Sequence, residues 1–242
     1  MTKIVILAAG NGTRMGANMP KVLVPLKGKP IIKYLIESII KSGVDKQPII
    51  VVSLDNKDSI SRSLDKYGCL YAVQTEQLGT GHALACAKDK ISEEADQIIC
   101  FYGDHPFISP DTIKRLTNNS QGVVTIMTTI VNDFDSWRQN LYYWGRIIRN
   151  HRIKEIVEYK DAAEEVRKLK EVNPGFYCFK NDWLWGNINK LKNNNVQREY
   201  YLTDLIKIAF EQGIKINSLT INPKETIGIN TKKELEIAET LI

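Results

Sequence analysis

The first half of the sequence alternates short apolar runs with segments of helical spacing. The apolar runs, which predict strands, occupy residues 4–7, 49–52, 70–73 and 98–102. Amphipathic helices are predicted at residues 30–41, 58–67 and 81–90, with Pro30 at the start of the first and Gly43 just past its end. This order predicts a Rossmann-like α/β fold, a mainly parallel sheet flanked by helices, with ligands beyond the carboxyl ends of its strands.

The second half is richer in strands. Strand-like runs occupy residues 123–131, 143–149, 152–157, 172–179 and 214–219, with a hairpin turn predicted at Asn150 and His151. Helices are expected at residues 182–192, 202–212 and 231–242, the last with Thr231 and Glu234 as a capping box. The sheet is therefore expected to be mixed. Because no proline- or glycine-rich linker interrupts the chain, we predict a single domain, residues 1–242, with halves of about 1–122 and 123–242.

Composition narrows the class of protein. The 43% hydrophobic and 25% charged residues are ordinary for a globular chain, and the net charge of +5 suits small polyanionic substrates. No apolar stretch approaches the roughly 20 residues of a membrane span and no signal segment opens the chain, so we expect a cytoplasmic protein without a membrane partner. Four widely spaced cysteines form no Cys-x-x-Cys pair, which favours free thiols over a zinc site.

The most basic local run extends from Arg146 to Lys154, within the predicted hairpin. Runs of charge most often lie on solvated surfaces, and less often form a patch that binds nucleic acid. We therefore expect a solvated hairpin here and no nucleic-acid partner.

A glycine-containing loop follows the first predicted strand, where residues 7–15 read Leu-Ala-Ala-Gly-Asn-Gly-Thr-Arg-Met. Glycines permit a tight turn, so backbone N–H groups can point at phosphate oxygens. The loop and the residues after it supply two small side chains, two glycines and two cations: Ala8, Ala9, Gly10, Gly12, Arg14 and Lys21. These residues alone predict a loop that cradles a nucleoside triphosphate.

Two other interpretations of this loop stay open from the residues alone. Met15 stands where a dinucleotide-binding fingerprint has its third glycine, although Gly16 would serve a looser variant. An ordinary strand-to-helix turn also accounts for the stretch. The spacing does exclude a Walker loop, because no Gly-Lys-Ser/Thr follows the first glycine at the required distance.

Two later stretches also carry chemistry. The amide of Gln74 can pair with a base edge, and Gly79 would let the backbone approach that base closely, although a glycine-rich helix start is the alternative. Asp104 follows the strand at 98–102, where a carboxylate is either a Mg²⁺ ligand or the cap of a turn. His105 has no second His or Cys at ligand spacing, so we expect it to support its neighbours rather than bind metal.

The loop at residues 7–15, followed by Pro20-Lys21, resembles the signature of sugar-1-phosphate nucleotidylyltransferases. The resemblance implies the fold of nucleotide-diphospho-sugar transferases, with Arg14 and Lys21 as catalytic residues that bind the phosphates. Gln-Leu-Gly-Thr-Gly-His-Ala at residues 77–83 is similar to the N-acetylglucosamine-1-phosphate uridylyltransferase branch. The nucleotide-binding residues so implied are Leu7, Ala8, Ala9, Gly10, Gly12, Thr13, Gln74, Gly79, Thr80, Tyr102 and Gly103.

Further motifs resemble the same branch and imply a metal site and an acceptor site. Tyr-Gly-Asp-x-Pro and Gly-Ile-Asn imply Asp104 and Asn230 as the Mg²⁺ ligands. The implied sugar-binding residues are Gly145, Glu158, Asn173, Tyr201 and Thr203. Without the resemblance, Thr203 would be a helix cap and Glu158 a solvated strand end. The sequence departs from the family's motifs at His105, Trp144 and Pro174.

The resemblance covers about residues 3–239 and implies an enzyme. The enzyme would transfer a uridylyl group from UTP to N-acetylglucosamine-1-phosphate with Mg²⁺, the acceptor phosphate attacking in line and pyrophosphate leaving. Residues 1–122 would bind the nucleotide and residues 123–242 the acceptor. No hexapeptide β-helix follows, so acetyl transfer is not expected. The alternatives are the same reaction on glucose-1-phosphate or dTTP, a non-catalytic nucleotide-sugar-binding protein and a nicotinamide oxidoreductase.

Overall fold

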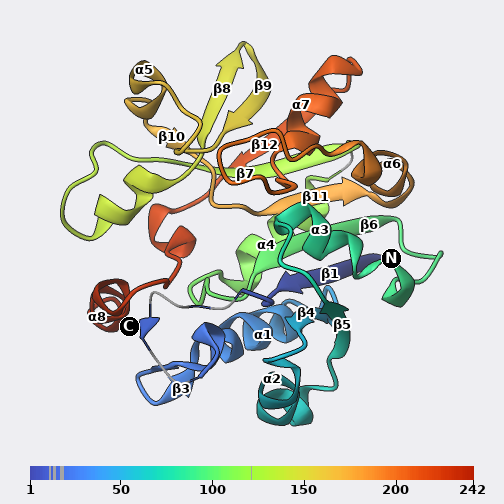
Figure 1. The fold of residues 1–242 in the computed structure, drawn as a ribbon, viewed down its shortest axis with the longest axis vertical. Helices are drawn as coiled ribbons and strands as arrows, with labels where there is room; N and C mark the ends of the chain where they lie inside the picture. Colours follow the sequence, from blue (N-terminus) through green and yellow to red (C-terminus); the bar gives the residue numbers. More distant parts are fainter. Residues whose placement is uncertain (11, 13–14, 17–18, 121) are drawn as a thin grey trace.

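A computed structural model describes residues 1–242 apart from residues 11, 13–14, 17–18 and 121. The described strands form a ten-stranded sheet and a small ribbon of β2 (Pro25–Leu26) and β3 (Lys29–Pro30). Helices cover both faces of the sheet (Figure 1). The predicted α/β fold with a mixed, mainly parallel sheet is confirmed.

The first half of the chain builds the parallel part of the sheet. β1 (Thr2–Leu7) lies between β4 (Ile49–Ser53) and β6 (Gln97–Tyr102), and β5 (Leu70–Gln74) pairs with the far side of β4. All of these pairs are parallel. Since parallel strands share one carboxyl end, the loops after β1, β5 and β6 meet at the same edge of the sheet.

The second half extends the sheet with antiparallel strands. β11 (Tyr177–Lys180) pairs with β6, and beyond it lie β7 (Val124–Ile130), β10 (Glu171–Val172), β8 (Arg146–Asn150) and β9 (Arg152–Val157). β12 (Ile216–Thr220) pairs parallel with β7. The hairpin of β8 and β9 is the one predicted around Asn150 and His151.

Alternation along β1 separates two hydrophobic cores, because successive side chains of a strand point to opposite faces. Ile4 and Ile6 share a core with α1 (Ile31–Ser42), α2 (Lys57–Leu64) and α4 (Pro110–Asn118). Val5 and Leu7 share the other with α3 (Thr80–Ala85), α6 (Asn181–Asn187) and α7 (Asp204–Glu211). The sheet is therefore buried on both faces, as a parallel sheet requires.

The shorter helical elements connect these parts. They are α5 (Glu164–Arg167) and the 3-10 helices η2 (Lys21–Leu23), η3 (Asp65–Tyr67), η4 (Lys88–Lys90), η5 (Ser136–Tyr143), η6 (Ile188–Lys190) and η7 (Pro223–Thr226). The helix predicted at residues 81–90 is thus α3 followed by η4, and α4, α5 and η5 were not predicted. No described helix is long and apolar enough to cross a membrane.

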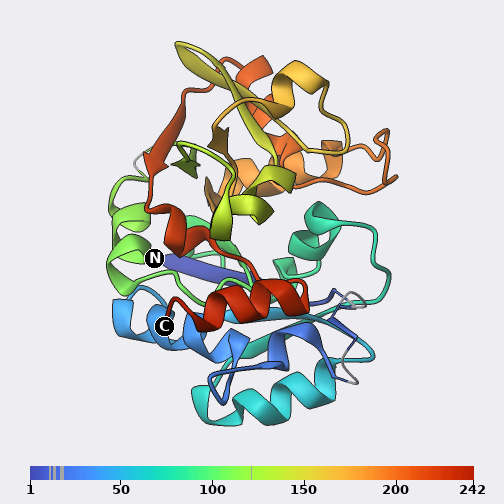
Figure 2. The same ribbon diagram turned by 90° about the vertical axis from the view of Figure 1, so that its left-hand side faces the viewer.

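The end of the chain returns to the N-terminal half through α8 (Lys232–Glu239), as Figure 2 shows. Leu235 and Ala238 pack with Leu26 and Ile31 beside the start of α1. Thr231 caps α8 by accepting a hydrogen bond from the backbone N–H of Glu234, as the sequence predicts. This return positions the residues just before α8 against the loop after β6.

The single strand predicted at residues 172–179 is wrong, because the chain forms two strands, β10 and β11. Val172 pairs with Thr129 of β7, whereas Tyr177 pairs with Ile126. The chain therefore advances five residues from β10 to β11 while β7 advances only three. Pro174 has no N–H to donate to a neighbouring strand. Gly175 has a φ of 84°, which glycine adopts readily. The chain therefore bulges away from the sheet between β10 and β11.

Candidate active site

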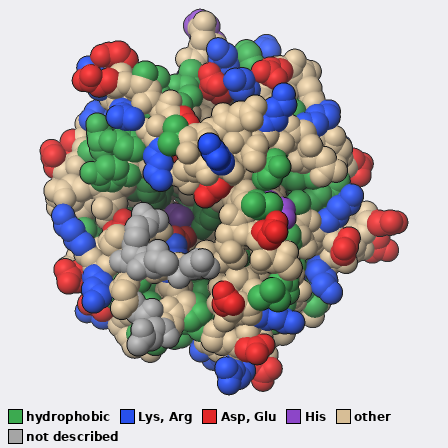
Figure 3. All heavy atoms as spheres, viewed as in Figure 1, with side chains coloured by type: hydrophobic (Ala, Val, Ile, Leu, Met, Phe, Trp, Pro, Cys, Tyr) green, Lys and Arg blue, Asp and Glu red, His purple; other side chains and the backbone are tan. Residues whose placement is uncertain are grey.

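Two adjoining pockets open at the carboxyl end of the parallel strands. Leu7, Ala8, Ala9, Gly10, Lys21, Gln74, Gly79 and Thr80 line the first. Gly145, Glu158, Asn173 and Pro174 line the second, and Tyr102 and Asp104 line both. Figure 3 shows the hollow near the middle of this face, with cationic, acidic and histidine side chains at its floor. The structure thus gathers most of the predicted site residues around Tyr102 and Asp104.

Hydrogen bonds fix Leu7 and Ala8, where the loop after β1 begins. The N–H of Ala8 donates to the carbonyl of Val51 (2.8 Å), and the N–H of Gly103 donates to the carbonyl of Leu7 (2.9 Å). The amide of Asn56 donates to the carbonyl of Ala8 (3.0 Å). Asn56 was not predicted, because its only sequence signal is a polar residue just after a buried strand. Thr13 and Arg14 lie outside the described residues.

Gly12 and Lys21 explain why this loop requires glycine. Gly12 has a φ of 60°, and a Cβ atom there would lie 2.6 Å from the Cβ of Lys21. A larger residue would therefore push away the lysine that follows the loop. Gly103, at the end of β6, is similarly close to its neighbours, since a Cβ there would lie 3.1 Å from Val22 and 3.4 Å from Ala8.

The loop after β5 is fixed by Gln74. Its amide nitrogen donates to the carbonyl of Gly79 (3.2 Å) and lies 3.1 Å from Nδ1 of His82. The side chain of Gln74 therefore fixes the loop through its amide nitrogen and also lines the first pocket. Gly79 itself has a φ of 108°, a conformation that glycine adopts with little strain.

Residues 200–202 join this loop to the second half of the chain. The N–H of Gly81 donates to the carbonyl of Tyr200 (2.8 Å), and the N–H of Tyr200 donates to the carbonyl of Leu78 (2.8 Å). The hydroxyl of Thr80 accepts from the N–H of Leu202 (3.0 Å). These contacts bring Glu199, just before the segment, to line the first pocket beside Gly79 and Thr80.

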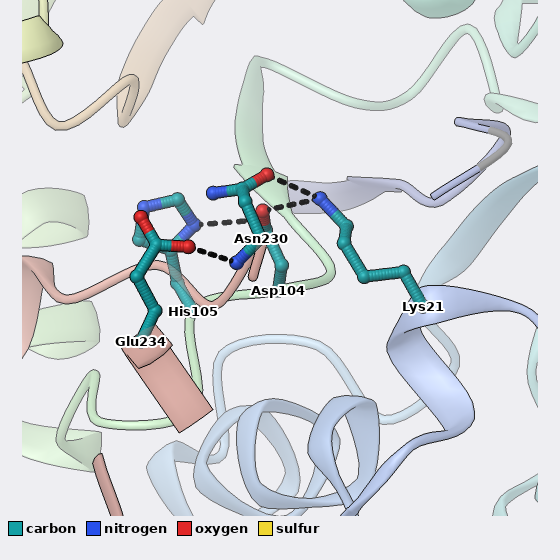
Figure 4. Close-up of polar contacts among 5 residues, drawn as sticks. All are labelled: Lys21, Asp104, His105, Asn230 and Glu234. Atoms are coloured by element: carbon teal, nitrogen blue, oxygen red, sulfur yellow. Dashed lines mark hydrogen bonds and ion pairs between the residues drawn. The ribbon is translucent and has the colours of Figure 1, made fainter. Parts of the chain in front are cut away.

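Four polar side chains meet where the two pockets join (Figure 4). The ammonium of Lys21 lies 2.6 Å from Oδ2 of Asp104 and 2.8 Å from Oδ1 of Asn230. Nδ1 of His105 lies 2.9 Å from Oδ1 of Asp104. The carboxylate of Glu234 accepts from the backbone N–H of Asn230 (2.6 Å), and thereby fixes the loop that carries this asparagine.

Asp104 is a buried carboxylate with two nitrogen partners. Burial alone would raise the pKa of Asp104, but the ammonium of Lys21 and the ring of His105 more than offset this effect and hold the pKa below its usual range. The carboxylate is therefore charged at neutral pH. His105 packs edge-on against Phe176 and Trp144, with ring centroids 4.9 and 5.6 Å away, and supports Asp104 from its side.

Asp104 and Asn230 fit a divalent cation. Among the described residues no group of three or more His, Cys, Asp or Glu side chains gathers around one point, so a metal here would have few protein ligands. The carboxylate and the amide oxygen nevertheless turn toward one cation, the ammonium of Lys21. Mg²⁺ commonly takes one or two protein ligands and completes its shell with water and phosphate oxygens.

The second pocket brings three of the predicted sugar-binding residues together. The N–H of Asn173 donates to the carbonyl of Gly145 (2.9 Å), and its side-chain amide donates to the hydroxyl of Tyr177 (2.6 Å). Its Oδ1 accepts from the N–H of Gly175 (3.0 Å), so the side chain closes a turn around Pro174. A Cβ atom on Gly145 would lie 3.5 Å from Oε2 of Glu158, which places these two residues side by side.

Tyr201 and Thr203 do not line the second pocket. Tyr201 lines a separate groove on the other side of Glu158, and the hydroxyl of Thr203 is buried without a hydrogen-bond partner among the described residues. Thr203 directly precedes α7, as its interpretation as a helix cap implies, but its side chain makes no capping hydrogen bond. That part of the interpretation is wrong, because the backbone of Thr203 is itself helical.

The prediction of a solvated hairpin is wrong at its first residue. Arg146 is fully buried, and its guanidinium donates to the carbonyls of Tyr142 (2.7 Å), Trp144 and Arg167 (2.9 Å). Charge in a sequence favours a solvated surface, but a guanidinium can be buried when carbonyl oxygens accept from its N–H groups. The exposed part of the hairpin begins at Arg149.

A family model of the MobA-like NTP transferase domain matches residues 4–171. The chain belongs to the MobA-like NTP transferase domain family. The match includes the loop after β1, the wall formed by Gln74 to Thr80 and the aspartate after β6. The nucleotidyltransferase resemblance predicted from the sequence motifs is therefore confirmed, and with it the class of enzyme.

Curated relatives match nearly the whole of this NTP transferase chain. The bifunctional protein GlmU of Caldicellulosiruptor saccharolyticus is 40% identical over 238 residues, which cover 97% of this chain and 50% of the relative. The bifunctional protein GlmU of Clostridium beijerinckii is 40% identical over 245 residues, which cover 98% of this chain and 51% of the relative. The chain thus spans about half the length of the curated relatives it matches.

A solved structure shows the same fold. A candidate glucose-1-phosphate thymidylyltransferase from Bacillus anthracis, crystallised with sucrose, superposes with a TM-score of 0.77. The superposition covers 100% of this chain and 95% of the other, at 21% sequence identity. At that identity the likeness concerns the fold alone, and it agrees with the α/β architecture of the NTP transferase chain.

Proposed function

We propose that this chain transfers a uridylyl group from UTP to N-acetylglucosamine-1-phosphate, forming UDP-N-acetylglucosamine and pyrophosphate. The observation that carries the proposal is the meeting of Lys21, Asp104 and Asn230 at the junction of the two pockets. A phosphoryl group bridging the pockets would lie beside one cation and two oxygens able to hold another. Such an arrangement suits nucleotidyl transfer, in which catalysis is mostly positioning and charge neutralisation.

The first pocket is the proposed nucleotide site. Its lining of backbone and small side chains at Leu7 to Gly10 suits a flat base and a triphosphate. We assign base recognition to Gln74, Gly79 and Thr80, and phosphate binding to Lys21 together with Gly12, Thr13 and Arg14. Tyr102 and Gly103 would form the floor under the α-phosphate, since Tyr102 lines both pockets. Residues 1–122 are accordingly the proposed nucleotide-binding half.

Asp104 and Asn230 are the proposed ligands of a Mg²⁺ ion. When bound, Mg²⁺ would neutralise charge on the triphosphate and on the leaving pyrophosphate. The chain's own contribution is to keep Asp104 ionised through Lys21 and His105, and to fix Asn230 through Glu234.

The second pocket is the proposed acceptor site, which makes residues 123–242 the acceptor half. The N–H of Gly145 and the side chains of Glu158 and Asn173 would meet the sugar hydroxyls and the acetamido group. Tyr201 and Thr203 are also assigned to sugar binding, and they would act by positioning Glu158 from the side that faces away from the second pocket. The acceptor phosphate is largely ionised near neutral pH, so it can attack the α-phosphorus without a protein base. The four free cysteines fit the proposed cytoplasmic location.

The test is pyrophosphate release with Mg²⁺, measured over UTP, dTTP, CTP and GTP, each with N-acetylglucosamine-1-phosphate or glucose-1-phosphate. Preference for UTP with the acetamido sugar is expected. The Asp104→Ala variant, purified in parallel, controls for contaminating host enzymes and should release almost none. Preference for another pair would retain the chemistry and overturn the substrates. Release with no pair, together with retained nucleotide binding, would leave a binding protein.

A further inference from the structure

We propose that Tyr143 forms the aromatic wall of the acceptor pocket and packs on the apolar face of the bound sugar. The proposal rests on the proposed function, since it assigns one more residue to the same acceptor site. Tyr143 ends η5, two residues before Gly145, and lines the second pocket together with Glu158 and Asn173.

The ring of Tyr143 is largely exposed to solvent at the second pocket. It is 63% exposed, whereas Phe210, the other exposed aromatic side chain among the described residues, is 39% exposed. An apolar ring at the mouth of a pocket costs free energy in water, and that cost is removed when a ligand covers the ring. The position of the ring at a pocket rather than on a flat face is what indicates a small-molecule ligand.

The ring is nevertheless held in place. Its centroid lies 5.5 Å from Tyr142 and 5.1 Å from Tyr159, with interplanar angles of 83° and 73°. Tyr142 and Tyr159 also contact each other, at 5.4 Å and 62°. Edge-to-face contacts of this kind are favourable for aromatic rings. Three rings that touch pairwise leave the exposed ring little freedom, so it is already positioned for a ligand.

One buried guanidinium fixes the backbone on both sides of Tyr143. Arg146 donates to the carbonyl of Tyr142 (2.7 Å) and to the carbonyl of Trp144, the residues before and after it. The guanidinium of Arg167 packs on the ring of Tyr159 at 4.5 Å. Arg146 also donates to the carbonyl of Arg167, so the same guanidinium stabilises the fold and fixes the backbone that carries Tyr143.

The chemistry of the pocket matches one class of ligand. A pyranose has polar edges and an apolar C–H face. Glu158, Asn173 and the backbone of Gly145 supply polar groups, while Tyr143 and Trp144 supply apolar area beside them. Sites that combine aromatic walls with a few converging polar groups bind such amphipathic small molecules. Tyr143 would thus contribute to KM for the sugar phosphate without contacting the reacting phosphorus.

The test compares Tyr143→Ala, Tyr143→Phe and Phe210→Ala. Phe210 is an exposed aromatic residue (39%) on α7 that lines neither pocket, and serves as the matched control. We expect Tyr143→Ala to raise KM for N-acetylglucosamine-1-phosphate about tenfold, which corresponds to about 1.4 kcal/mol. KM for UTP, kcat and the melting temperature should stay close to wild type. Tyr143→Phe should restore the sugar KM, because the ring and not the hydroxyl makes the contact.

Each other outcome has a definite meaning. A wild-type enzyme that turns over, with an unchanged sugar KM in Tyr143→Ala, overturns the role of Tyr143 and leaves the proposed function standing. A change in oligomeric state by size-exclusion chromatography with unchanged KM overturns it in favour of a protein interface. If wild type neither turns over nor, by calorimetry with Mg²⁺ and UTP present, binds either sugar phosphate, the proposed function fails and this proposal fails with it.

Discussion

Lys21 holds Asp104 and Asn230 together across the junction of the two pockets. Its ammonium lies 2.6 Å from Oδ2 of Asp104 and 2.8 Å from Oδ1 of Asn230. The same two oxygens are the ones that would hold a Mg²⁺ ion. The ammonium and the ion therefore compete for one position. If the ion binds there, Lys21 must turn away, and the phosphates that arrive with the ion are its natural new partners.

Replacement of Lys21 should reduce turnover while the fold is retained. Removal of one positioned charge or donor at a reacting phosphate typically costs a factor of about 10² to 10³ in rate. We expect a loss of that size for Lys21→Met in pyrophosphate release, with an unchanged near-ultraviolet circular dichroism spectrum. Lys46→Met, at an exposed lysine, is the control. Turnover equal to that of the control would remove Lys21 from the mechanism.

The same variant should bind metal more readily in the absence of nucleotide. Without the ammonium, Oδ2 of Asp104 and Oδ1 of Asn230 lose the cation that they share, while His105 still pairs with Oδ1 of Asp104. A buried carboxylate that loses its charged partner favours a metal ion. We expect Lys21→Met to bind Mn²⁺ about tenfold more tightly than wild type, measured by electron paramagnetic resonance without nucleotide. Lys21→Met with Asp104→Asn should lose the gain. Equal Mn²⁺ affinity in wild type and Lys21→Met would contradict the competition.

The parallel strands, and the site residues that follow their carboxyl ends, could be predicted because the sequence signals for them are local. Runs such as Ile49 to Val52 are apolar on both faces, as buried parallel strands are. Asp104 follows such a run, so its place at the sheet edge follows from the order of the elements. The approach of Asn230 to Asp104 came from the family resemblance, since α8 returns through packing that local sequence patterns do not encode.

The errors have equally particular causes. Arg146 resembles its exposed neighbours in sequence, and the carbonyls that bury it belong partly to Arg167, 21 positions away. The break between β10 and β11 had a signal, because proline is rare inside strands, yet the apolar residues around Pro174 outweighed it. The three departures from the family motifs, His105, Trp144 and Pro174, all line the second pocket. Nothing in their sequence positions indicated that they lie together.

Gly79→Ala should disrupt the contact between the loop after β5 and residues 200–202. Gly79 has a φ of 108°, and a Cβ there would lie 2.8 Å from the backbone N and O of Tyr200. Backbone atoms cannot give way cheaply, so we expect a loss of about 3 kcal/mol in unfolding free energy and a higher KM for UTP. Gly68→Ala is the control for a left-handed position without a clash, since its φ is 61° and no atom lies within 4 Å. Gly79 has a ψ of 178°, which alanine adopts with greater strain, so part of its larger loss is backbone strain.

The control should lose only about 1 kcal/mol, the usual cost of a left-handed conformation at alanine. Urea denaturation of both variants gives the comparison directly. Equal losses would mean that backbone strain alone explains both, and that the contact with Tyr200 contributes nothing.

Glu158 should make stability depend on pH between about 4.3 and 7. Burial, together with the negative charges of Asp161, Asp204 and Glu199, raises the pKa of Glu158 to about 7. In the unfolded chain the pKa is about 4.3. In this interval the folded state holds a proton that the unfolded state has lost, so the free energy of unfolding falls as pH rises, by about 4 kcal/mol in all.

Glu158→Gln should remove that slope. The glutamine amide is neutral throughout this range. The free energy of unfolding of the variant should therefore vary less than that of wild type between pH 4.5 and 7.5, as measured by urea denaturation at several pH values. Glu155→Gln is the control on β9, three residues before Glu158, at a carboxylate that lies 3.7 Å from Lys207. A wild-type profile parallel to that of Glu158→Gln would show that the buried carboxyl titrates normally.

Arg146→Met should destabilise the fold and weaken acceptor binding together. The buried guanidinium donates to the carbonyls of Tyr142, Trp144 and Arg167, which would lose these donors in the variant. Each buried carbonyl left without a partner costs about 1–3 kcal/mol, so we expect a loss of at least about 3 kcal/mol in urea denaturation. KM for the sugar phosphate should rise as well, because Tyr143 loses the backbone contacts on both of its sides.

Arg149→Met separates this effect from loss of charge on the same strand. Arg149 pairs with Glu171 at 2.5 Å near the surface, and such ion pairs contribute less than about 1 kcal/mol. Its variant should unfold and turn over nearly as wild type does. If Arg146→Met and Arg149→Met lost the same small amount of unfolding free energy, water or other donors would be satisfying the three carbonyls. The position of Tyr143 would then depend on its contacts with Tyr142 and Tyr159 alone.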